Sequence, residues 1–371
     1  MPGNQDGSSP HFARLIAALP PSTPFVAPEA LERQTGSPIR LRLGANESAF
    51  GMSPVTTEAM QQAAVSSNWY GDPESFELRR ALAQKHHVSE NNIVVGNGID
   101  GLLGYVVRAF VDPQSKVITS LGTYPTFAYH VIAAGGKLVR VPYDGDRPDL
   151  QALLDAAKRD EARLVYLANP DNPSGGWQKS NDLVGFIDQL PRSTMLVLDE
   201  AYAEFAPSDG IVPINTAWRN VVRVRTFSKV HGMAGARIGY AIAATDVIDA
   251  IGKFRNQFEV SRVSQAGALA ALENESFVKS VIGAVDEGRR DLVGLASVLG
   301  LSTLPSATNF VCIDVGGPER AKRIVAALLE RGVFIRMPGE APLNRCVRVT
   351  IGTIEQRAQF SEVFSDVMQR L

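Results

Sequence analysis

The sequence has little cysteine and no surplus of either charge. Its 371 residues include two cysteines, Cys312 and Cys346, and neither stands at a spacing typical of metal ligands. Two cysteines cannot build the disulfide scaffold of a small secreted protein, so we expect a cytoplasmic location and no metal. The 37 basic and 39 acidic residues nearly cancel. Because nucleic acids and anionic membranes attract basic surfaces, neither is an expected partner.

Long apolar runs are also missing. No stretch approaches the roughly 20 apolar residues that cross a membrane as a helix. Residues 1–10 carry no Lys or Arg, and the apolar residues 15–19 run directly into Pro20 and Pro21, so no signal peptide is expected. With 45% hydrophobic and 20% charged residues, the composition is typical of a soluble globular protein of two or three domains, or of one large domain with an attached lobe.

Beyond an N-terminal arm, expected at residues 1–45 to pack on a small lobe or a partner subunit, β-branched runs alternate with helical patterns. This alternation defines a large domain at residues 46–260. Apolar strands joined by helices indicate an α/β fold with a mostly parallel sheet covered on both faces. The expected strands are residues 92–95, 116–119, 137–141, 163–167, 194–198 and 220–225.

The last third of the chain has a different pattern. A long helical region, roughly residues 246–296 with one break near Asn274, is followed by strand-like residues 308–315, 332–337 and 346–350. Helical patterns at residues 318–331 and 354–371 alternate with these strands. We therefore expect a smaller α+β domain at residues 261–371.

Residues 96–101 read G-N-G-I-D-G and fit the dinucleotide fingerprint G-x-G-x-x-G. An NAD-dependent dehydrogenase is therefore one alternative. The acidic residue that should follow about 20 residues later to bind the ribose is missing, because the strand at 116–119 is followed by Ser120, Leu121 and Gly122. Since the start of a helix binds any phosphate, the loop favours a different phosphate, with a structural glycine turn as the remaining interpretation.

Other polar side chains follow predicted strands. Asp199 and Tyr202 come directly after the strand at 194–198, and Asn172 lies in the Pro- and Gly-rich turn that follows residues 163–167. The carboxyl ends of parallel strands are where α/β sheets bind ligands. Because a buried carboxylate is costly without a cation, Asp199 is a candidate for chemistry.

Lys229 follows the strand at 220–225, between Ser228 and Arg237, which suit a phosphate. Together the motifs require a ligand with a phosphate, a ring nitrogen, a ring oxygen and an aldehyde for a lysine. Pyridoxal phosphate has all four groups, and its enzymes use a lysine and an acidic partner of the pyridinium nitrogen.

These motifs resemble those of the fold-type I aminotransferases, and specifically the histidinol-phosphate aminotransferase branch. Residues 43–47, L-G-A-N-E, resemble the branch's N-E-N-P opening, and residues 345–353 resemble its C-terminal R-x-T-x-G-T motif. The resemblance extends from about residue 41 to residue 371. It implies the fold type I architecture, in which a seven-stranded, mostly parallel sheet forms the large domain beside a smaller C-terminal α+β lobe.

The resemblance assigns catalytic roles to three residues. Lys229 bonds to the cofactor aldehyde and later moves a proton between substrate and cofactor, Asp199 keeps the ring nitrogen protonated, and Tyr202 holds the ring oxygen together with Asn172. Tyr124 stacks on the ring. The phosphate is held by Gly98, Ile99, Asp100, Ser228, Arg237 and Tyr70 of the partner subunit, which implies a homodimer.

The resemblance also implies the substrates, a small-molecule amino donor and a 2-oxo acid. Arg348 matches the residue that binds the α-carboxylate of glutamate or 2-oxoglutarate, and Arg336 matches the one that binds the phosphate of histidinol phosphate. Asn46 lies near the substrate amine or carboxylate.

The chain departs from the branch at Ile99, where Ser or Ala is usual, at Gly101, where Glu is usual, and at Gly71, where Pro is usual. These changes affect the pocket that binds the amino donor, so an aromatic amino acid remains a rival donor.

A decarboxylase of the threonine-phosphate type is the alternative on the same scaffold. A regulatory domain that merely holds the cofactor is disfavoured because Lys229, Asp199 and Arg348 are all present.

Overall fold

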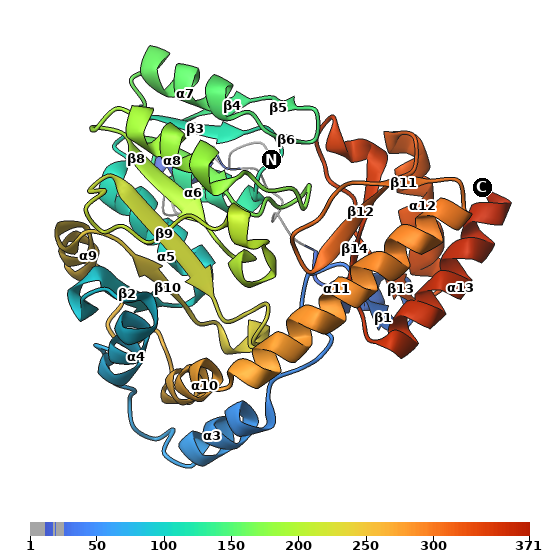
Figure 1. Cartoon of the computed structure of the whole chain (residues 1–371), viewed down its shortest axis with the longest axis horizontal. Helices are drawn as coiled ribbons and strands as arrows, with labels where there is room; N and C mark the ends of the chain where they lie inside the picture. The colour runs from blue at the N-terminus through green and yellow to red at the C-terminus, as the bar shows by residue number, and fades with distance from the viewer. Residues whose placement is uncertain (1–11, 18, 20–25) are drawn as a thin grey trace, which may run out of the picture.

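A central sheet of seven strands organises the chain (Figure 1). The computed structural model describes residues 12–17, 19 and 26–371, so the part of the expected N-terminal arm at residues 1–11, 18 and 20–25 lies outside the description. In spatial order the strands are β2 (Ile93–Gly96), β10 (Gly239–Ile242), β9 (Val221–Thr226), β8 (Met195–Asp199), β7 (Leu164–Ala168), β3 (Lys116–Ser120) and β4 (Lys137–Val141). β10 is antiparallel to both neighbours and the other pairs are parallel, which confirms the predicted α/β sheet.

Helices cover both faces of this sheet. In chain order the helices of the described residues are α1 (Arg14–Ala17), α2 (Pro28–Thr35), α3 (Pro54–Ala64), α4 (Phe76–His86), α5 (Gly98–Phe110), α6 (Pro125–Ala133), α7 (Leu150–Arg159), α8 (Ser180–Gln189), α9 (Thr245–Gly252), α10 (Arg262–Glu273), α11 (Glu275–Val298), α12 (Pro318–Glu330) and α13 (Ile354–Arg370), of which α11, α12 and α13 pack with the second lobe rather than on this sheet. Successive strand residues point to opposite faces. Leu164 and Tyr166 therefore pack with α5, α6 and α9, whereas Val165 and Leu167 pack with α7 and α8. Among the described residues, no helix is long and apolar enough to cross a membrane.

A second lobe contains two small sheets. The strands β11 (Ser302–Thr303), β12 (Phe310–Asp314) and β14 (Cys346–Thr350) pair antiparallel, and β1 (Leu41–Arg42) pairs parallel with β13 (Val333–Phe334). A short hairpin, β5 (Tyr143–Asp144) with β6 (Arg147–Pro148), belongs to the larger part. Both cysteines are buried in the core of the second lobe. The pairing of β1 with β13 carries the N-terminal segment across to the C-terminal lobe.

Two details of the predicted C-terminal pattern are wrong. The helical region has a second break, because α9 ends at Gly252 and α10 begins at Arg262, where the Ser261 hydroxyl accepts from the Ser264 N–H and caps the new helix. The strand expected at residues 332–337 is shorter, because β13 covers only Val333–Phe334 and Arg336 forms an isolated bridge to Arg348. The expected domain boundaries at residues 45 and 260 stay predictions, and α10 packs against α3 and α4 beside the large sheet (Figure 1).

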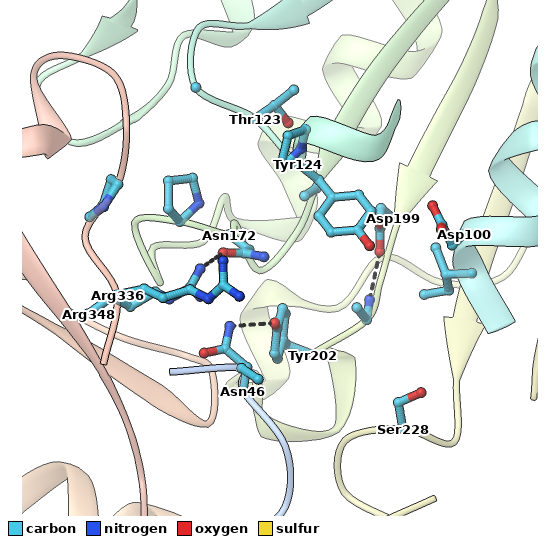
Figure 2. Close-up of a pocket in the computed structure, with 18 of the residues that line it drawn as sticks. Asn46, Asp100, Thr123, Tyr124, Asn172, Asp199, Tyr202, Ser228, Arg336 and Arg348 are labelled. Carbon is cyan, nitrogen blue, oxygen red and sulfur yellow. Dashed lines mark hydrogen bonds between the residues drawn. The ribbon is translucent and has the colours of Figure 1, made fainter. Parts of the chain in front are cut away.

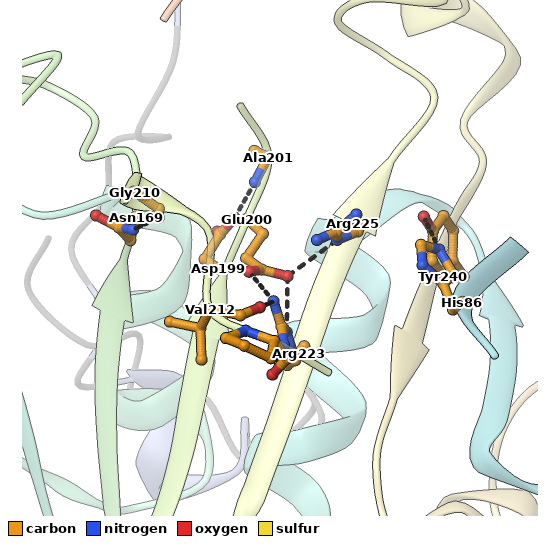
Figure 3. Close-up of polar contacts among 11 residues, drawn as sticks. His86, Asn169, Asp199, Glu200, Ala201, Gly210, Val212, Arg223, Arg225 and Tyr240 are labelled. Atoms are coloured by element: carbon orange, nitrogen blue, oxygen red, sulfur yellow. Dashed lines mark hydrogen bonds and ion pairs between the residues drawn. The ribbon is translucent and has the colours of Figure 1, made fainter. Parts of the chain in front are cut away.

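Buried ion pairs join β8 to β9, next to the strand ends that open into the pocket drawn in Figure 2. Glu200 directly follows β8, and its carboxylate accepts from Arg223 at 2.5 Å and Arg225 at 2.9 Å on β9 (Figure 3). Burial alone would raise the pKa of Glu200, but the guanidiniums of Arg225 and Arg223 outweigh burial and lower it to about 2. The buried, charged Glu200 therefore connects the two strands through ion pairs.

Replacing Glu200 by Gln keeps the side chain's shape and removes the carboxylate that both buried guanidiniums contact. We expect Glu200→Gln to lower the free energy of unfolding by about 3–5 kcal/mol, measured by urea denaturation. The control is Glu77→Gln, because Glu77 pairs with Arg80 on the exposed surface of α4, where losing an ion pair costs ~0.5 kcal/mol. Equal effects of the two substitutions would contradict this role of Glu200.

Candidate active site

A cavity of about 810 Å³ lies where the carboxyl ends of the parallel strands face the second lobe. It brings together most of the site residues predicted from the sequence (Figure 2). Those in its lining are Asn46, Ile99, Asp100, Tyr124, Asn172, Asp199, Tyr202, Ser228, Lys229, Arg237, Arg336 and Arg348. Gly98, the first residue of α5, is not in the lining. Tyr70 is absent from the lining and is 77% exposed.

Asp199 ends β8 as a carboxylate that is 5% exposed. Its Oδ2 accepts a hydrogen bond from the Tyr166 hydroxyl at 2.7 Å, and its Oδ1 accepts from the Ala201 N–H at 3.0 Å. Burial raises the pKa of Asp199 to about 6, and these two hydrogen bonds oppose that shift. The carboxylate is thus oriented by donors and forms no ion pair with a side chain in the described part of the chain, which suits it to a protonated nitrogen in the cavity.

Lys229 follows β9, and its amine donates to the backbone carbonyl of Asn46 at 2.8 Å. Burial lowers the pKa of Lys229 to about 8, and the nearby Arg348 acts in the same direction. A substantial fraction of the amine is therefore neutral near pH 8. A neutral amine is the form that attacks a carbonyl carbon.

Tyr202 lies beneath the cavity and is 3% exposed. Its hydroxyl accepts a hydrogen bond from the Asn46 side-chain amide at 3.0 Å (Figure 2). Burial raises the pKa of Tyr202 well above its usual range, so the hydroxyl keeps its proton. It can donate that proton to a ring oxygen placed in the cavity.

One end of the cavity can hold an anion. The helix α5 begins at Gly98, whose φ of +70° favours glycine, and a Cβ at this position would collide with the guanidinium of Arg237. Ser228 lies opposite the start of this helix in the lining, and its hydroxyl accepts from Thr226 at 2.8 Å. Free N–H groups of a first helical turn, a hydroxyl and an arginine together fit a phosphate.

Two arginines lie at the other end. Arg336 and Arg348 face each other across an isolated antiparallel bridge, so their side chains leave the backbone on the same side. Arg348 donates to the side-chain oxygen of Asn172 at 2.5 Å (Figure 2) and to the backbone carbonyl of Gly44 at 3.1 Å. Burial lowers the pKa of each arginine, and Arg348 lowers that of Arg336 further. Two like charges on one face favour a bound anion.

One buried polar atom of Arg348 points to a missing partner. Arg348 forms no ion pair with any residue in the described ranges, and its buried Nε has no hydrogen-bond acceptor there. Arg336 donates to the Val26 carbonyl at 2.9 Å, which brings the N-terminal segment to the rim of the cavity. Residues 27–29 of that segment also line the cavity, which the sequence did not predict.

Tyr124 directly precedes α6 and lines the cavity, as predicted. Burial raises its pKa to about 12. Figure 2 shows its ring lying beside Asp199, where it can cover one face of a planar ligand.

Sequence reasoning missed Tyr166 and Thr119, two polar side chains inside apolar strands. Tyr166 orients Asp199, as described above. The Thr119 hydroxyl is buried at the end of β3 and has no hydrogen-bond partner among the described residues. Both line the cavity. The sequence did contain a signal for both residues, because each hydroxyl lies within two residues of the end of its strand, β3 for Thr119 and β7 for Tyr166.

The residues present fit the predicted cofactor. An anion cradle at α5, a buried carboxylate for a ring nitrogen, two groups for a ring oxygen and a lysine with a lowered pKa surround one cavity. Within the described ranges, no group of three or more His, Cys, Asp or Glu side chains could hold a metal ion. The donor set is that of an organic cofactor with a phosphate.

Comparisons with known proteins agree with this geometry. The model of the family "Aminotransferase class I and II" matches residues 38–364. Histidinol-phosphate aminotransferase 2 of Carboxydothermus hydrogenoformans is 34% identical over 362 residues, which cover 96% of this chain and 99% of the relative. The histidinol-phosphate aminotransferase of Bacillus subtilis is 31% identical, over 95% of this chain and 98% of its own length.

Solved structures share the fold. The crystal structure of histidinol-phosphate aminotransferase from Sinorhizobium meliloti in complex with pyridoxal-5'-phosphate is 46% identical, with a TM-score of 0.95 over 98% of this chain and 99% of that one. A mutant of Thermus thermophilus aspartate aminotransferase is 25% identical, with a TM-score of 0.82 over 97% of this chain and 100% of that one. The chain belongs to the class I and II aminotransferase family.

Proposed function

We propose that the protein is a pyridoxal-phosphate-dependent aminotransferase that moves an amino group between histidinol phosphate, or an aromatic amino acid, and 2-oxoglutarate. The observation that carries this proposal is the joint placement of Lys229, Asp199 and the Arg336–Arg348 pair around one cavity. The names of the relatives and of the Sinorhizobium meliloti structure support the same activity and cofactor.

Bound pyridoxal phosphate supplies an aldehyde for amines and a ring that withdraws electrons from the substrate. Asp199 holds the proton on the ring nitrogen, and Asn172 and Tyr202 hold the ring oxygen. The start of α5 with Ser228 and Arg237 holds the phosphate. Lys229 carries the proton to and from the substrate carbon.

The arginine pair defines the substrates as anions. Arg348, already held by Asn172 and Gly44, binds the α-carboxylate that glutamate and 2-oxoglutarate share. Arg336 binds the phosphate of histidinol phosphate. No described contact favours the threonine-phosphate decarboxylase alternative, and membership of the family disfavours the dehydrogenase suggested by residues 96–101.

The proposed assembly is a homodimer, and the proposed location is the cytoplasm. Tyr70 and Phe258 pack together with ring centroids 4.6 Å apart and are 77% and 53% exposed, beside Trp69 at 69%. Such an exposed aromatic cluster suits a partner surface, and it supports the role of Tyr70 at the phosphate of the partner subunit. Two free, buried cysteines suit a reducing compartment.

The first test of this function is a half-reaction. Protein loaded with pyridoxal phosphate is expected to convert one equivalent of glutamate to 2-oxoglutarate without an added oxo acid and without releasing carbon dioxide. Lys229→Ala should lose both the visible absorbance of the loaded protein and this conversion, whereas Lys137→Ala, at the exposed start of β4, should keep both. Carbon dioxide release, or conversion by Lys229→Ala at the wild-type rate, would refute the proposal.

Removing the Tyr166 hydroxyl should shift the pH dependence. The hydroxyl lowers the pKa of Asp199, so Tyr166→Phe raises that pKa while the ring stays stacked on Phe127. Asp199 is then protonated at higher pH, and we expect the acid limb of the half-reaction profile to move up by roughly one pH unit. Tyr143→Phe is the control, since it removes a comparable hydroxyl from the buried Asp171. An unmoved acid limb in Tyr166→Phe would exclude this role.

Arg336 should distinguish the donors. Arg336→Ala is expected to raise KM for histidinol phosphate about 10–100-fold, as losing a charge-assisted hydrogen bond does, and to leave KM for phenylalanine within roughly threefold. Steady-state kinetics with 2-oxoglutarate as acceptor measures both. If the substitution spares histidinol phosphate, the phosphate assignment of Arg336 is wrong.

A further inference from the structure

Asn46 has a left-handed backbone although it is not glycine. Its φ is +54°, and the residue is 2% exposed at the junction of the two lobes. Residues with a side chain rarely adopt this conformation, and Asn tolerates it better than most. A buried residue in such a conformation needs neighbours that hold it there.

In this conformation two groups of Asn46 form hydrogen bonds with residues of the site. The backbone carbonyl accepts from the Lys229 amine at 2.8 Å, and the side-chain amide donates to the Tyr202 hydroxyl at 3.0 Å. Both contacts require the same orientation of one residue. A rotation of the Asn46 backbone would therefore disturb both Lys229 and Tyr202.

Two buried residues of the second lobe hold Asn46. The Thr350 hydroxyl, at the end of β14, accepts from the Asn46 backbone N–H at 3.1 Å and donates to its side-chain oxygen at 3.1 Å. The Asn309 side-chain amide donates to the Asn46 carbonyl at 3.1 Å. Each of these residues is 3% exposed. Neither is in the cavity lining, so each acts through Asn46.

We propose that Thr350 and Asn309 are positioning residues for Lys229, because they fix the Asn46 carbonyl that receives its amine. The proposal rests on the proposed function. An amine that donates one N–H to a carbonyl keeps its lone pair pointing elsewhere, since a carbonyl only accepts. Lys229 can then take a proton from a substrate carbon on the cavity side while the Asn46 carbonyl holds its amine in position.

The test is Thr350→Val, which keeps the β-branched shape and removes the hydroxyl. Two hydrogen bonds of the buried Asn46 are lost, so we expect kcat of the glutamate half-reaction to fall on the order of 10-fold, with KM changed less than ~3-fold. A structural role alone would not separate kcat from KM. Asn309→Ala is the second variant and should lower kcat in the same way.

A second readout uses the protein without cofactor. The pH dependence of Lys229 acetylation, followed by peptide mass spectrometry, reports the pKa of its amine. The charged groups that influence the amine, Arg348, Glu47, Arg237 and Asp199, are unchanged in the variant. Losing the carbonyl acceptor disfavours the ammonium form, so the midpoint should move to lower pH in Thr350→Val.

Two controls separate positioning from stability. Thr350→Ser keeps the hydroxyl and should restore both the wild-type kcat and the acetylation midpoint. Thr194→Val removes a buried hydroxyl that donates to the Ala162 carbonyl at 2.7 Å, at the opposite end of β8 from Asp199, and should lower only the melting temperature.

The proposal is overturned if Thr350→Val and Asn309→Ala lower the melting temperature while kcat and the midpoint stay at wild-type values. It is also overturned if Thr350→Ser fails to restore them. Failure of the proposed function is a separate result, because the wild-type protein itself would then not convert glutamate. The acetylation midpoint would still report whether Thr350 acts on Lys229.

Discussion

The ion pairs of Glu200 with Arg223 and Arg225 hold together the two strands whose ends carry the chemistry. Asp199 ends β8, and the turn with Ser228 and Lys229 follows β9, so any change in the spacing of these strands would separate the carboxylate from the amine. Asp199 and Glu200 are adjacent, yet burial raises the pKa of the first and two guanidiniums lower that of the second. Of these two adjacent carboxylates, Glu200 joins the strands and Asp199 faces the cavity.

Two segments that are far apart in the sequence complete the site. The segment from β1 to Asn46 pairs with the C-terminal lobe and then enters the cavity, and β14 brings Arg348 and Thr350 to meet it. Lys229 therefore lies between a turn of the large sheet and a segment anchored in the other lobe. The lobes are coupled through the residues that contact the Lys229 amine, so the proposed catalytic geometry depends on how the lobes pack.

Strand ends made much of the site predictable from the sequence. Asp199, Lys229 and Asn172 each follow an apolar run, and in a parallel sheet such residues meet at one edge. The contacts of Asn46 were not predictable, because Thr350 is 304 residues away and no local pattern marks it. Tyr166 was hidden because an aromatic residue in a buried strand is ordinarily core. The short strand β10 and the break before α10 were missed because a four-residue strand and a helix cap give weak local signals.

The arginine pair has a practical consequence for work with this protein. Arg336 and Arg348 repel each other on one face, so any small anion of suitable shape relieves that repulsion. Phosphate or sulfate in a buffer would compete with anionic substrates for the same place. Apparent affinities would then depend on the buffer as well as on ionic strength, and zwitterionic buffers give the fairer comparison between donors.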